Sequence, residues 1–201
     1  MSALEIADIV GIICFALSGF VIAVHYNLDI LGVFISAFLT ALGGGMIRDV
    51  IANKTPYVLS DNLPIILVSS TLLLAFIFKF HKITDLEGKT WFIASDAIGL
   101  VSFAITGALI GIDANFNFLG VLMLAFLTAV GGGTIRDILI NKIPSILISE
   151  FYGTVAIIIG LITYFLHLTN LSSIITLTIT FIFGVTLRLL AFYRKWSLPK
   201  L

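Results

Sequence analysis

Two charged motifs interrupt the most apolar parts of this sequence. Gly43-Gly-Gly-Met-Ile-Arg-Asp49 and Gly131-Gly-Gly-Thr-Ile-Arg-Asp137 each place an arginine and an aspartate directly after three glycines. An ionised side chain within a lipid bilayer needs a partner of opposite charge or a water-filled cavity. Residues of these types at this spacing therefore indicate either a buried ion network or a path along which ions move.

Two further aspartates are the expected partners of these arginines. Asp8 and Asp96 each lie near the start of an apolar segment. At 1.5 Å of rise per residue, Arg48 and Asp8 lie about 10 Å from the bilayer centre on one side. Adjacent residues diverge on a helix, so an Arg-Asp dipeptide alone cannot form the whole network. We predict two clusters, one near each membrane surface, in which Arg48 contacts Asp8 and Asp49, and Arg136 contacts Asp96 and Asp137.

Two interpretations of each cluster stay open. The cluster is either a neutral buried network that locks the helix ends or a gate at the mouth of a pathway. Hydroxyl side chains are equally ambiguous: Thr40 and Thr128 precede the glycines by three residues, and Ser18 and Thr106 occupy matching places in the preceding segments. These hydroxyls either line a path or bond to carbonyls of their own helix, which is the commoner arrangement.

The glycine triplets are costly if they lie within helices. Each glycine costs about 1 kcal/mol relative to alanine. Close packing in lipid explains single glycines well. Because three consecutive glycines occur in both motifs, we favour a kink or a short unwound stretch. Such a break frees backbone carbonyls, which a partner helix, water or an ion must then satisfy. The residues concerned are Gly43, Gly44 and Gly45, and Gly131, Gly132 and Gly133.

The segments that carry these residues have the composition of membrane-spanning helices. Of the 201 residues, 60% are hydrophobic and 11% are charged, against roughly 25% charged in soluble domains. The apolar runs approach the 20 residues or so that cross a bilayer. We predict an all-α integral membrane protein with seven transmembrane helices, at about residues 6–25, 30–52, 63–80, 91–112, 116–140, 145–167 and 171–192.

The chain contains an internal repeat. Residues 8–56 align with residues 96–144 without a gap, and nearly half of the positions are identical. Because one unit has three helices, the second copy crosses the membrane in the opposite direction, as in folds whose binding site or pathway lies between two inverted repeats. The predicted divisions are residues 1–88, residues 89–169 and a seventh helix with a basic tail in residues 170–201.

Basic residues predict the orientation of the chain. With the N-terminus outside, only Lys54 lies on the outer side, whereas the inner side holds Lys79, Lys82, Lys89, Lys142, Arg194, Lys195 and Lys200. This bias predicts a multi-pass protein of the inner (plasma) membrane with a cytoplasmic C-terminus. The net charge is zero and Cys14 is the only cysteine. We therefore expect membrane lipid as a partner, no nucleic acid, no cysteine-based metal cluster and no cofactor.

The paired motif resembles that of the prokaryotic trimeric intracellular cation (TRIC) channels. Two Gly-Gly-Gly-x-Ile-Arg-Asp motifs, 88 residues apart in a chain of seven predicted helices, carry the resemblance. Bacterial members have a duplicated domain, UPF0126, that is also labelled a glycine-transporter domain. The resemblance implies a homotrimer with one pore in each protomer, permeable to monovalent cations such as potassium and sodium. It further implies pores centred on the second and fifth helices, where the two glycine triplets lie.

Several classes of function are compatible with a membrane protein of this kind. A cation channel is favoured, and a secondary transporter of a small solute such as glycine is the alternative, because inverted repeats with broken helices are also typical of transporters. An intramembrane enzyme is disfavoured, since the predicted inversion puts Asp49 and Asp137 on opposite sides of the midplane. A purely structural scaffold leaves the repeated glycines and charges unexplained.

Overall fold

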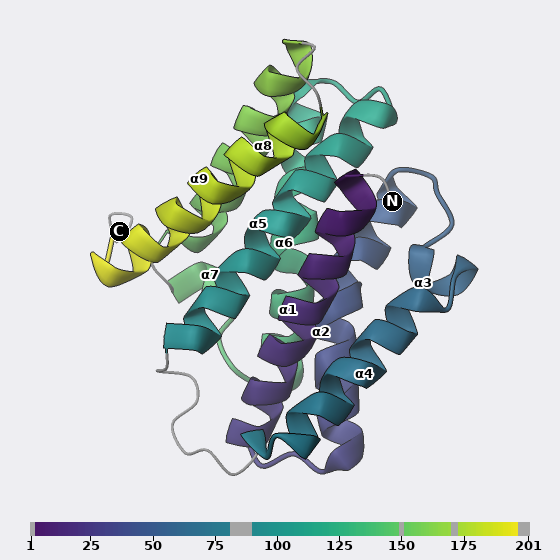
Figure 1. Cartoon of the computed structure of the whole chain (residues 1–201), viewed down its shortest axis with the longest axis vertical. Helices are drawn as coiled ribbons and strands as arrows, with labels where there is room; N and C mark the ends of the chain where they lie inside the picture. The colour runs from purple at the N-terminus through teal and green to yellow at the C-terminus, as the bar shows by residue number, and fades with distance from the viewer. Residues whose placement is uncertain (1–2, 81–89, 149–150, 170–172, 197–201) are drawn as a thin grey trace.

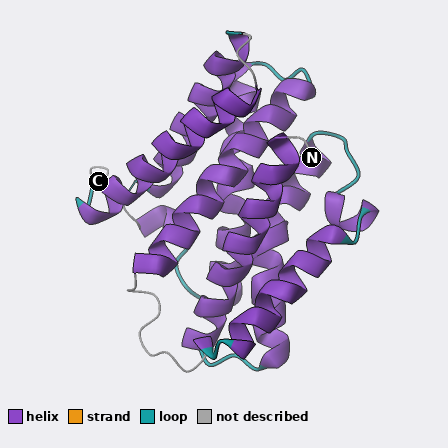
Figure 2. Cartoon of the chain, in the orientation of Figure 1, coloured by secondary structure: helices purple, strands orange, loops and turns teal. Residues whose placement is uncertain are grey.

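The computed structural model describes residues 3–80, 90–148, 151–169 and 173–196, and all regular structure in these residues is helical (Figure 2). Within these described residues, five helices are long and apolar enough to cross a membrane. They are α1 (Ala3–His25), α2 (Ile30–Ile51), α5 (Thr90–Asp113), α6 (Phe118–Leu139) and α9 (Ser173–Tyr193). Two apolar helices are shorter, α4 (Leu63–Ile77) and α8 (Tyr152–Leu168), and α3 (Tyr57–Ser60) and α7 (Ser145–Ile148) are single turns.

Each of the seven predicted segments contains one of these longer helices. The sixth segment, predicted as continuous over residues 145–167, is divided into α7 and α8, and Phe151 has a left-handed φ of 52° just before α8 begins. The third segment ends at Ile77 rather than at Phe80. Of the basic residues used to predict orientation, Lys82, Lys89 and Lys200 lie outside the described residues, as does Leu171 at the start of the last segment.

Local sequence explains where the helices begin and end. Asp29 and Asn117 accept hydrogen bonds from the amides of Gly32 (2.7 Å) and Gly120 (2.8 Å), and so cap the N-termini of α2 and α6. Side-chain oxygens at this position satisfy amides that have no partner within the helix. The C-terminal ends use asparagine in the left-handed region, which this residue tolerates better than most. These residues are Asn27, Asn53, Asn115 and Asn141, with φ between 54° and 57°.

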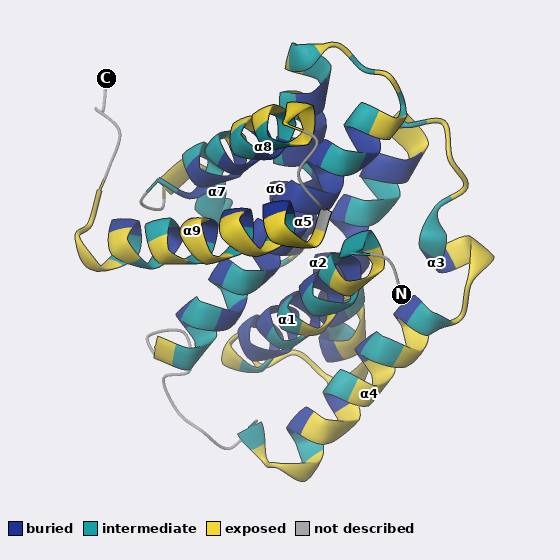
Figure 3. Ribbon diagram, turned by 45° about the horizontal axis from the view of Figure 1, so that its top comes forward, coloured by how far each residue is buried: buried dark blue, intermediate teal, exposed yellow. Residues whose placement is uncertain are grey.

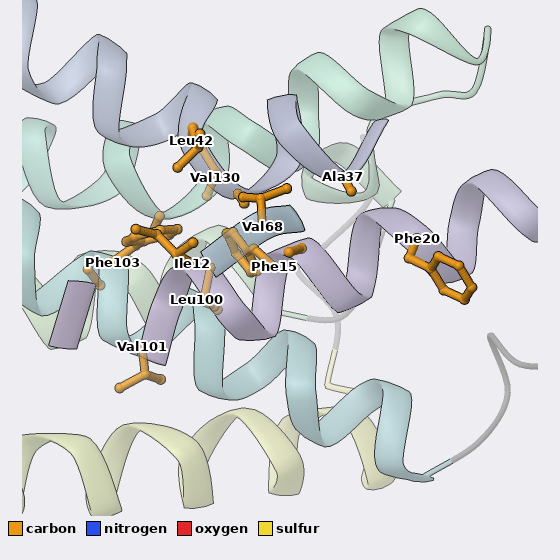
Figure 4. Packing of buried hydrophobic residues seen from close by; sticks show 14 of the residues in the cluster. Ile12, Phe15, Phe20, Ala37, Leu42, Val68, Leu100, Val101, Phe103 and Val130 are labelled. Carbon is orange, nitrogen blue, oxygen red and sulfur yellow. The ribbon is translucent and has the colours of Figure 1, made fainter. Parts of the chain in front are cut away.

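The centre of the molecule is the packing of α1 against α5. The rings of Phe15 and Phe103 meet edge to face with centroids 5.2 Å apart. A Cβ on Gly99 would overlap Phe15, and a Cβ on Gly11 would overlap Phe103, so each ring packs on a glycine of the other helix. Figure 4 shows these two rings between α1 and α5 together with Ile12 and Leu100. The contacts are reciprocal, as an approximate two-fold axis between the two helices requires.

The other helices surround this pair (Figure 1). Helices α2 and α4 pack on α1, while α6, α8 and α9 pack on α5 or on one another. Buried residues gather toward the centre, and α4 and α9 carry rows of exposed residues on their outer sides (Figure 3). Those exposed residues are largely apolar, among them Leu73, Ile77, Ile174 and Ile182. An apolar exterior over a polar cluster in the interior is the arrangement that suits a lipid solvent.

The glycine triplets hold α2 and α6 together and do not unwind them. Both helices continue through the glycines without interruption, so the unwound stretch, one of the two predicted alternatives, is wrong, whereas the kink stays a prediction. A Cβ on Gly44 would overlap the carbonyl oxygen of Thr128, and a Cβ on Gly132 would overlap that of Thr40. The two backbones therefore approach more closely than any side chain permits. This is the close packing through small residues that lipid favours.

Candidate functional site

Arg48 is the centre of the first buried cluster. Its Nη1 donates to Oδ1 of Asp8 at 2.7 Å, and its Nε donates to Oδ1 of Asp49 at 2.8 Å. Nη1 also donates to the hydroxyl of Thr106, on α5, at 3.1 Å. The predicted contacts of Arg48 with both aspartates are confirmed. The cluster thus joins α1 and α2 to a helix of the second half of the chain.

Asp49 also binds the backbone that follows α2. The amide of Lys54 donates to the carbonyl of Asp49 at 2.8 Å, across the left-handed turn at Asn53. The chain reverses there, and the amide of Tyr57, the first residue of α3, donates to Oδ2 of Asp49 at 2.9 Å. One carboxylate therefore neutralises an arginine and fixes the loop beside it. The repeated Asn-Lys-x-Pro sequence was the signal of this turn.

Arg136 is the centre of the second cluster. Its Nη2 and Nε donate to Oδ1 of Asp137 at 2.7 and 2.9 Å, which confirms that predicted pair. Oδ2 of Asp137 accepts from the amide and the hydroxyl of Ser145, at 2.7 and 2.9 Å. Ser145 is the first residue of α7 and occupies the place that Tyr57 has in the first half. The turn after α6 is thus fixed in the same way as the turn after α2.

The predicted direct contact between Arg136 and Asp96 is wrong. Nη1 of Arg136 donates to the hydroxyl of Ser18 at 3.0 Å, and this hydroxyl donates to Oδ1 of Asp96 at 3.1 Å. Ser18 therefore relays the interaction between the two charges. Thr106, the equivalent residue, instead donates to the carbonyl of Phe103 in its own helix, at 3.3 Å. The hydroxyl of Ser18 thus donates to the neighbouring helix, whereas that of Thr106 donates within its own helix.

Thr40 and Thr128 have the more common of the two roles left open by the sequence. Their hydroxyls donate to the carbonyls of Ser36 and Leu124, four residues earlier, at 2.6 Å in both cases. Both side chains are fully buried. A hydroxyl that bonds to its own helix can be buried at the α2–α6 contact without an unsatisfied donor.

Each cluster borders its own hollow. The first has a volume of about 20 Å³, and Asp8, Arg48, Asp49 and Tyr57 line it. This is room for about one water molecule. The second is larger, about 170 Å³, and its polar lining consists of Asp96, Arg136, Lys142, Ser145, Tyr152 and Arg188. Because α1 and α5 run in opposite directions (Figure 1), the start of each helix, and with it Asp8 or Asp96, lies at a different end of the bundle.

Two residues of the second hollow were not predicted from the sequence. Tyr152 is buried at the start of α8, and its hydroxyl interacts with Asp96. Arg188 is buried in α9, with its guanidinium carbon 4.8 Å from the centroid of the Tyr152 ring. The signal for Arg188 was present, because it is a charged residue in the interior of the last apolar segment. Tyr152 gave no comparable signal, since the first half has Pro64 at the equivalent position.

Comparisons with known proteins agree with this geometry. The glycine transporter family model matches the chain twice, at residues 5–81 and 93–168. The UPF0126 membrane protein YvgT of Bacillus subtilis is 36% identical, over 98% of this chain and 96% of that protein. A structure solved to explain conductance through TRIC cation channels is 34% identical with a TM-score of 0.86, and covers 100% of this chain and 98% of that one.

A crystal structure of a prokaryotic TRIC channel in 0.5 M KCl is similarly close. It is 32% identical with a TM-score of 0.87, over 97% of this chain and 98% of that one. The double match of one family model accords with the reciprocal contacts of α1 with α5 and of α2 with α6. This multi-pass membrane protein therefore belongs to the prokaryotic TRIC family, whose curated bacterial relatives are the UPF0126 membrane proteins.

Proposed function

We propose that this protein is a cation channel. The observation that carries the proposal is the likeness, over the whole chain, to a solved TRIC cation channel at 34% identity. The Arg48 cluster gives the proposal a physical basis, because it combines two buried carboxylates with one guanidinium inside an apolar bundle. Excess buried negative charge attracts cations and repels anions.

The proposed path runs through each protomer between the two hollows. It serves monovalent cations such as potassium and sodium, and the Arg48 and Arg136 clusters act as its two gates. Between them lie α2 and α6, in contact at Gly44 and Gly132. Opening then requires a movement of these helices relative to each other, because their backbones are packed closely together at this contact. No catalytic residue and no cofactor belongs to this proposal.

The proposed arrangement in the membrane has seven spans. Helices α1, α2 and α4 form one repeat, α5, α6 and α8 form the inverted repeat, and α9 is the additional helix. The short α4 and α8, of 15 and 17 residues, each follow a one-turn helix that extends the segment. The N-terminus lies outside and the C-terminus inside. Three protomers assemble, as the family name implies, each with its own path.

A secondary transporter is the second candidate. It is favoured by the description of the matching family model, glycine transporter, and by an architecture that carriers also use. A carrier exposes its site to one side at a time, and the two separate hollows are compatible with that mechanism.

Recording from purified protein in a planar bilayer separates the two candidates. For a channel, we expect unitary currents in KCl whose reversal potential in a KCl gradient follows potassium rather than chloride. For a carrier, proteoliposomes take up radiolabelled glycine with saturable kinetics while the bilayer shows no unitary current. The second result would refute the channel.

A further inference from the structure

Each of the two arginines binds a hydroxyl that belongs to the opposite repeat. Arg48, in the first half of the chain, donates to the hydroxyl of Thr106 on α5 at 3.1 Å. Arg136, in the second half, donates to the hydroxyl of Ser18 on α1 at 3.0 Å. Ser18 and Thr106 are equivalent residues of the two repeats, and both are fully buried. The hydrogen bonds that tie α2 to α5 and α6 to α1 are therefore themselves a symmetric pair.

Helices α2 and α6 are each fixed at two further points before their arginines. Early in α2, a Cβ on Gly19 of α1 would lie 2.7 Å from the Cα of Ala37. Early in α6, a Cβ on Gly107 of α5 would lie 2.8 Å from the Cα of Ala125. Along both helices, this close contact comes first, the contact between α2 and α6 comes second, and the arginine comes last. Each helix thus resembles a lever that is held at one end and crosses its partner before it reaches the cluster.

The contact at which α2 and α6 cross is reciprocal as well. Apart from the backbone overlap at the middle glycines, a Cβ on Gly43 would lie 3.1 Å from Cδ1 of Ile135, and a Cβ on Gly131 would lie 3.2 Å from Cδ1 of Ile47. The isoleucine of each motif therefore packs on a glycine of the other motif. Closely packed interiors transmit a displacement instead of absorbing it. Neither helix can change its direction at this contact without displacing the other.

We propose that the two clusters open together, because the contact between α2 and α6 transmits the release of one arginine to the other. The inference rests on the proposed channel function, in which each cluster is a gate. When Arg48 leaves Thr106, α2 turns on α6, and the change in their crossing draws Arg136 away from Ser18. Ser18 and Thr106 are thus positioning residues, each of which holds the arginine of the opposite repeat in place. A carrier needs the reverse relation, since one end must close as the other opens.

Cysteine labelling at the end opposite to a mutation measures this coupling. Ile12 and Ile22 both lie on α1 and are buried, and Ile12 lines the first hollow whereas Ile22 lines the second. Introduced singly into a Cys14→Ser background, Ile12→Cys and Ile22→Cys report how fast a water-soluble maleimide reaches each end of the purified protein in detergent. Thr106→Ala removes a hydrogen bond to a charged group, and we expect it to speed labelling of Ile22→Cys about tenfold. Ser18→Ala should speed labelling of Ile12→Cys in the same way.

Three controls separate coupling from a general loosening of the structure. Thr163→Ala removes the same atoms as Thr106→Ala from a buried threonine of α8 whose hydroxyl bonds within its own helix, and should leave both labelling rates unchanged. Thr106→Ser keeps the hydroxyl and should restore slow labelling of Ile22→Cys. Val68→Cys, at a fully buried position that lines neither hollow, should stay unlabelled in every variant.

The possible outcomes distinguish failure of the coupling from failure of the channel. Faster labelling only at the mutated end, or at neither end, overturns the coupling and leaves the channel function standing. Labelling of Val68→Cys in parallel assigns the change to unfolding and overturns the coupling too. Slower labelling at the far end shows that the two ends alternate, which refutes the channel together with the coupling. Because Ser18→Ala and Thr106→Ala test opposite directions, either one suffices if the other fails to fold.

Discussion

The guanidinium of Arg48 contacts Asp8 directly, whereas that of Arg136 reaches Asp96 only through the hydroxyl of Ser18. The first arrangement neutralises charge by direct contact in the interior, where a buried arginine that loses its partner is strongly destabilising. The second arrangement depends on a neutral hydroxyl, whose hydrogen bonds contribute less to stability than a direct contact between two charges. Two copies of one motif thus give clusters of different strength.

We predict that Asp8→Asn destabilises the protein more than Asp96→Asn. Asp8→Asn removes one of the two carboxylates in direct contact with Arg48, and should lower the free energy of unfolding by about 2 kcal/mol. Asp96→Asn leaves the Arg136–Asp137 pair intact and should lower it by no more than about 1 kcal/mol. Unfolding of the purified variants in detergent, followed by circular dichroism, measures both changes.

A double-mutant cycle gives the control for this comparison. Asp8→Asn should have a much smaller effect in the Arg48→Gln background, because the two residues in contact share one interaction. Equal effects in both backgrounds would show that the 2.7 Å contact contributes nothing to stability.

The sequence was sufficient to predict which residues form these clusters, but not to predict how the residues are hydrogen-bonded to one another. The repeat identified both arginines and all four aspartates as members of the two clusters, because charge inside an apolar helix must be compensated. It did not reveal the Ser18 relay, because a direct and a bridged contact differ only by the width of a hydroxyl. That distance is set by the packing of α1 on α5, around Phe15 and Phe103.

The contact between α2 and α6 depends on one glycine of each triplet. A Cβ on Gly44 would overlap the carbonyl oxygen of Thr128, which is backbone and cannot move aside, whereas a Cβ on Gly45 would meet only the end of Arg48, at 3.9 Å. We predict that Gly44→Ala lowers the free energy of unfolding by about 2–3 kcal/mol through overpacking. Gly45→Ala should raise it by up to about 1 kcal/mol through helix propensity.

Thermal unfolding of the two variants in detergent measures this difference in stability. The equivalent glycines of α6 provide an independent test. Gly132→Ala should behave like Gly44→Ala, and Gly133→Ala like Gly45→Ala, because their surroundings are equivalent. If all four alanine variants were tolerated alike, the close approach of the two backbones would not contribute to stability.

Helix positions followed from apolar runs, which are local features of the sequence. The structural effect of the glycine triplets could not be predicted from local sequence, because it depends on what the neighbouring helix places against them. A glycine triplet permits either an unwound stretch or a close neighbour, and only the position of Thr40 and Thr128 across the interface distinguishes them. The division of the sixth segment at Phe151 was missed because the segment is apolar throughout.

The molecule as a whole has two similar halves whose first helices are antiparallel, so equivalent residues lie at opposite ends (Figure 1). The contacts agree with this arrangement: Arg48 joins Asp8 at the start of α1 to Thr106 late in α5, while Ser18 late in α1 bonds to Asp96 near the start of α5. If α1 and α5 cross a membrane, the turns after α2 and α6 must then face different compartments.

This consequence is testable with one cysteine in each turn. Thr55 and Ile143 are equivalent in the repeat, and both are exposed, so cysteine at either position is accessible without disturbing the interior. In a Cys14→Ser background, which removes the only native cysteine, we expect a membrane-impermeant maleimide to label Thr55→Cys in intact cells. Ile143→Cys should be labelled only after permeabilisation. Labelling of both variants in intact cells would contradict the inverted arrangement, whereas the reverse pattern would keep the inversion and overturn only the predicted N-out orientation.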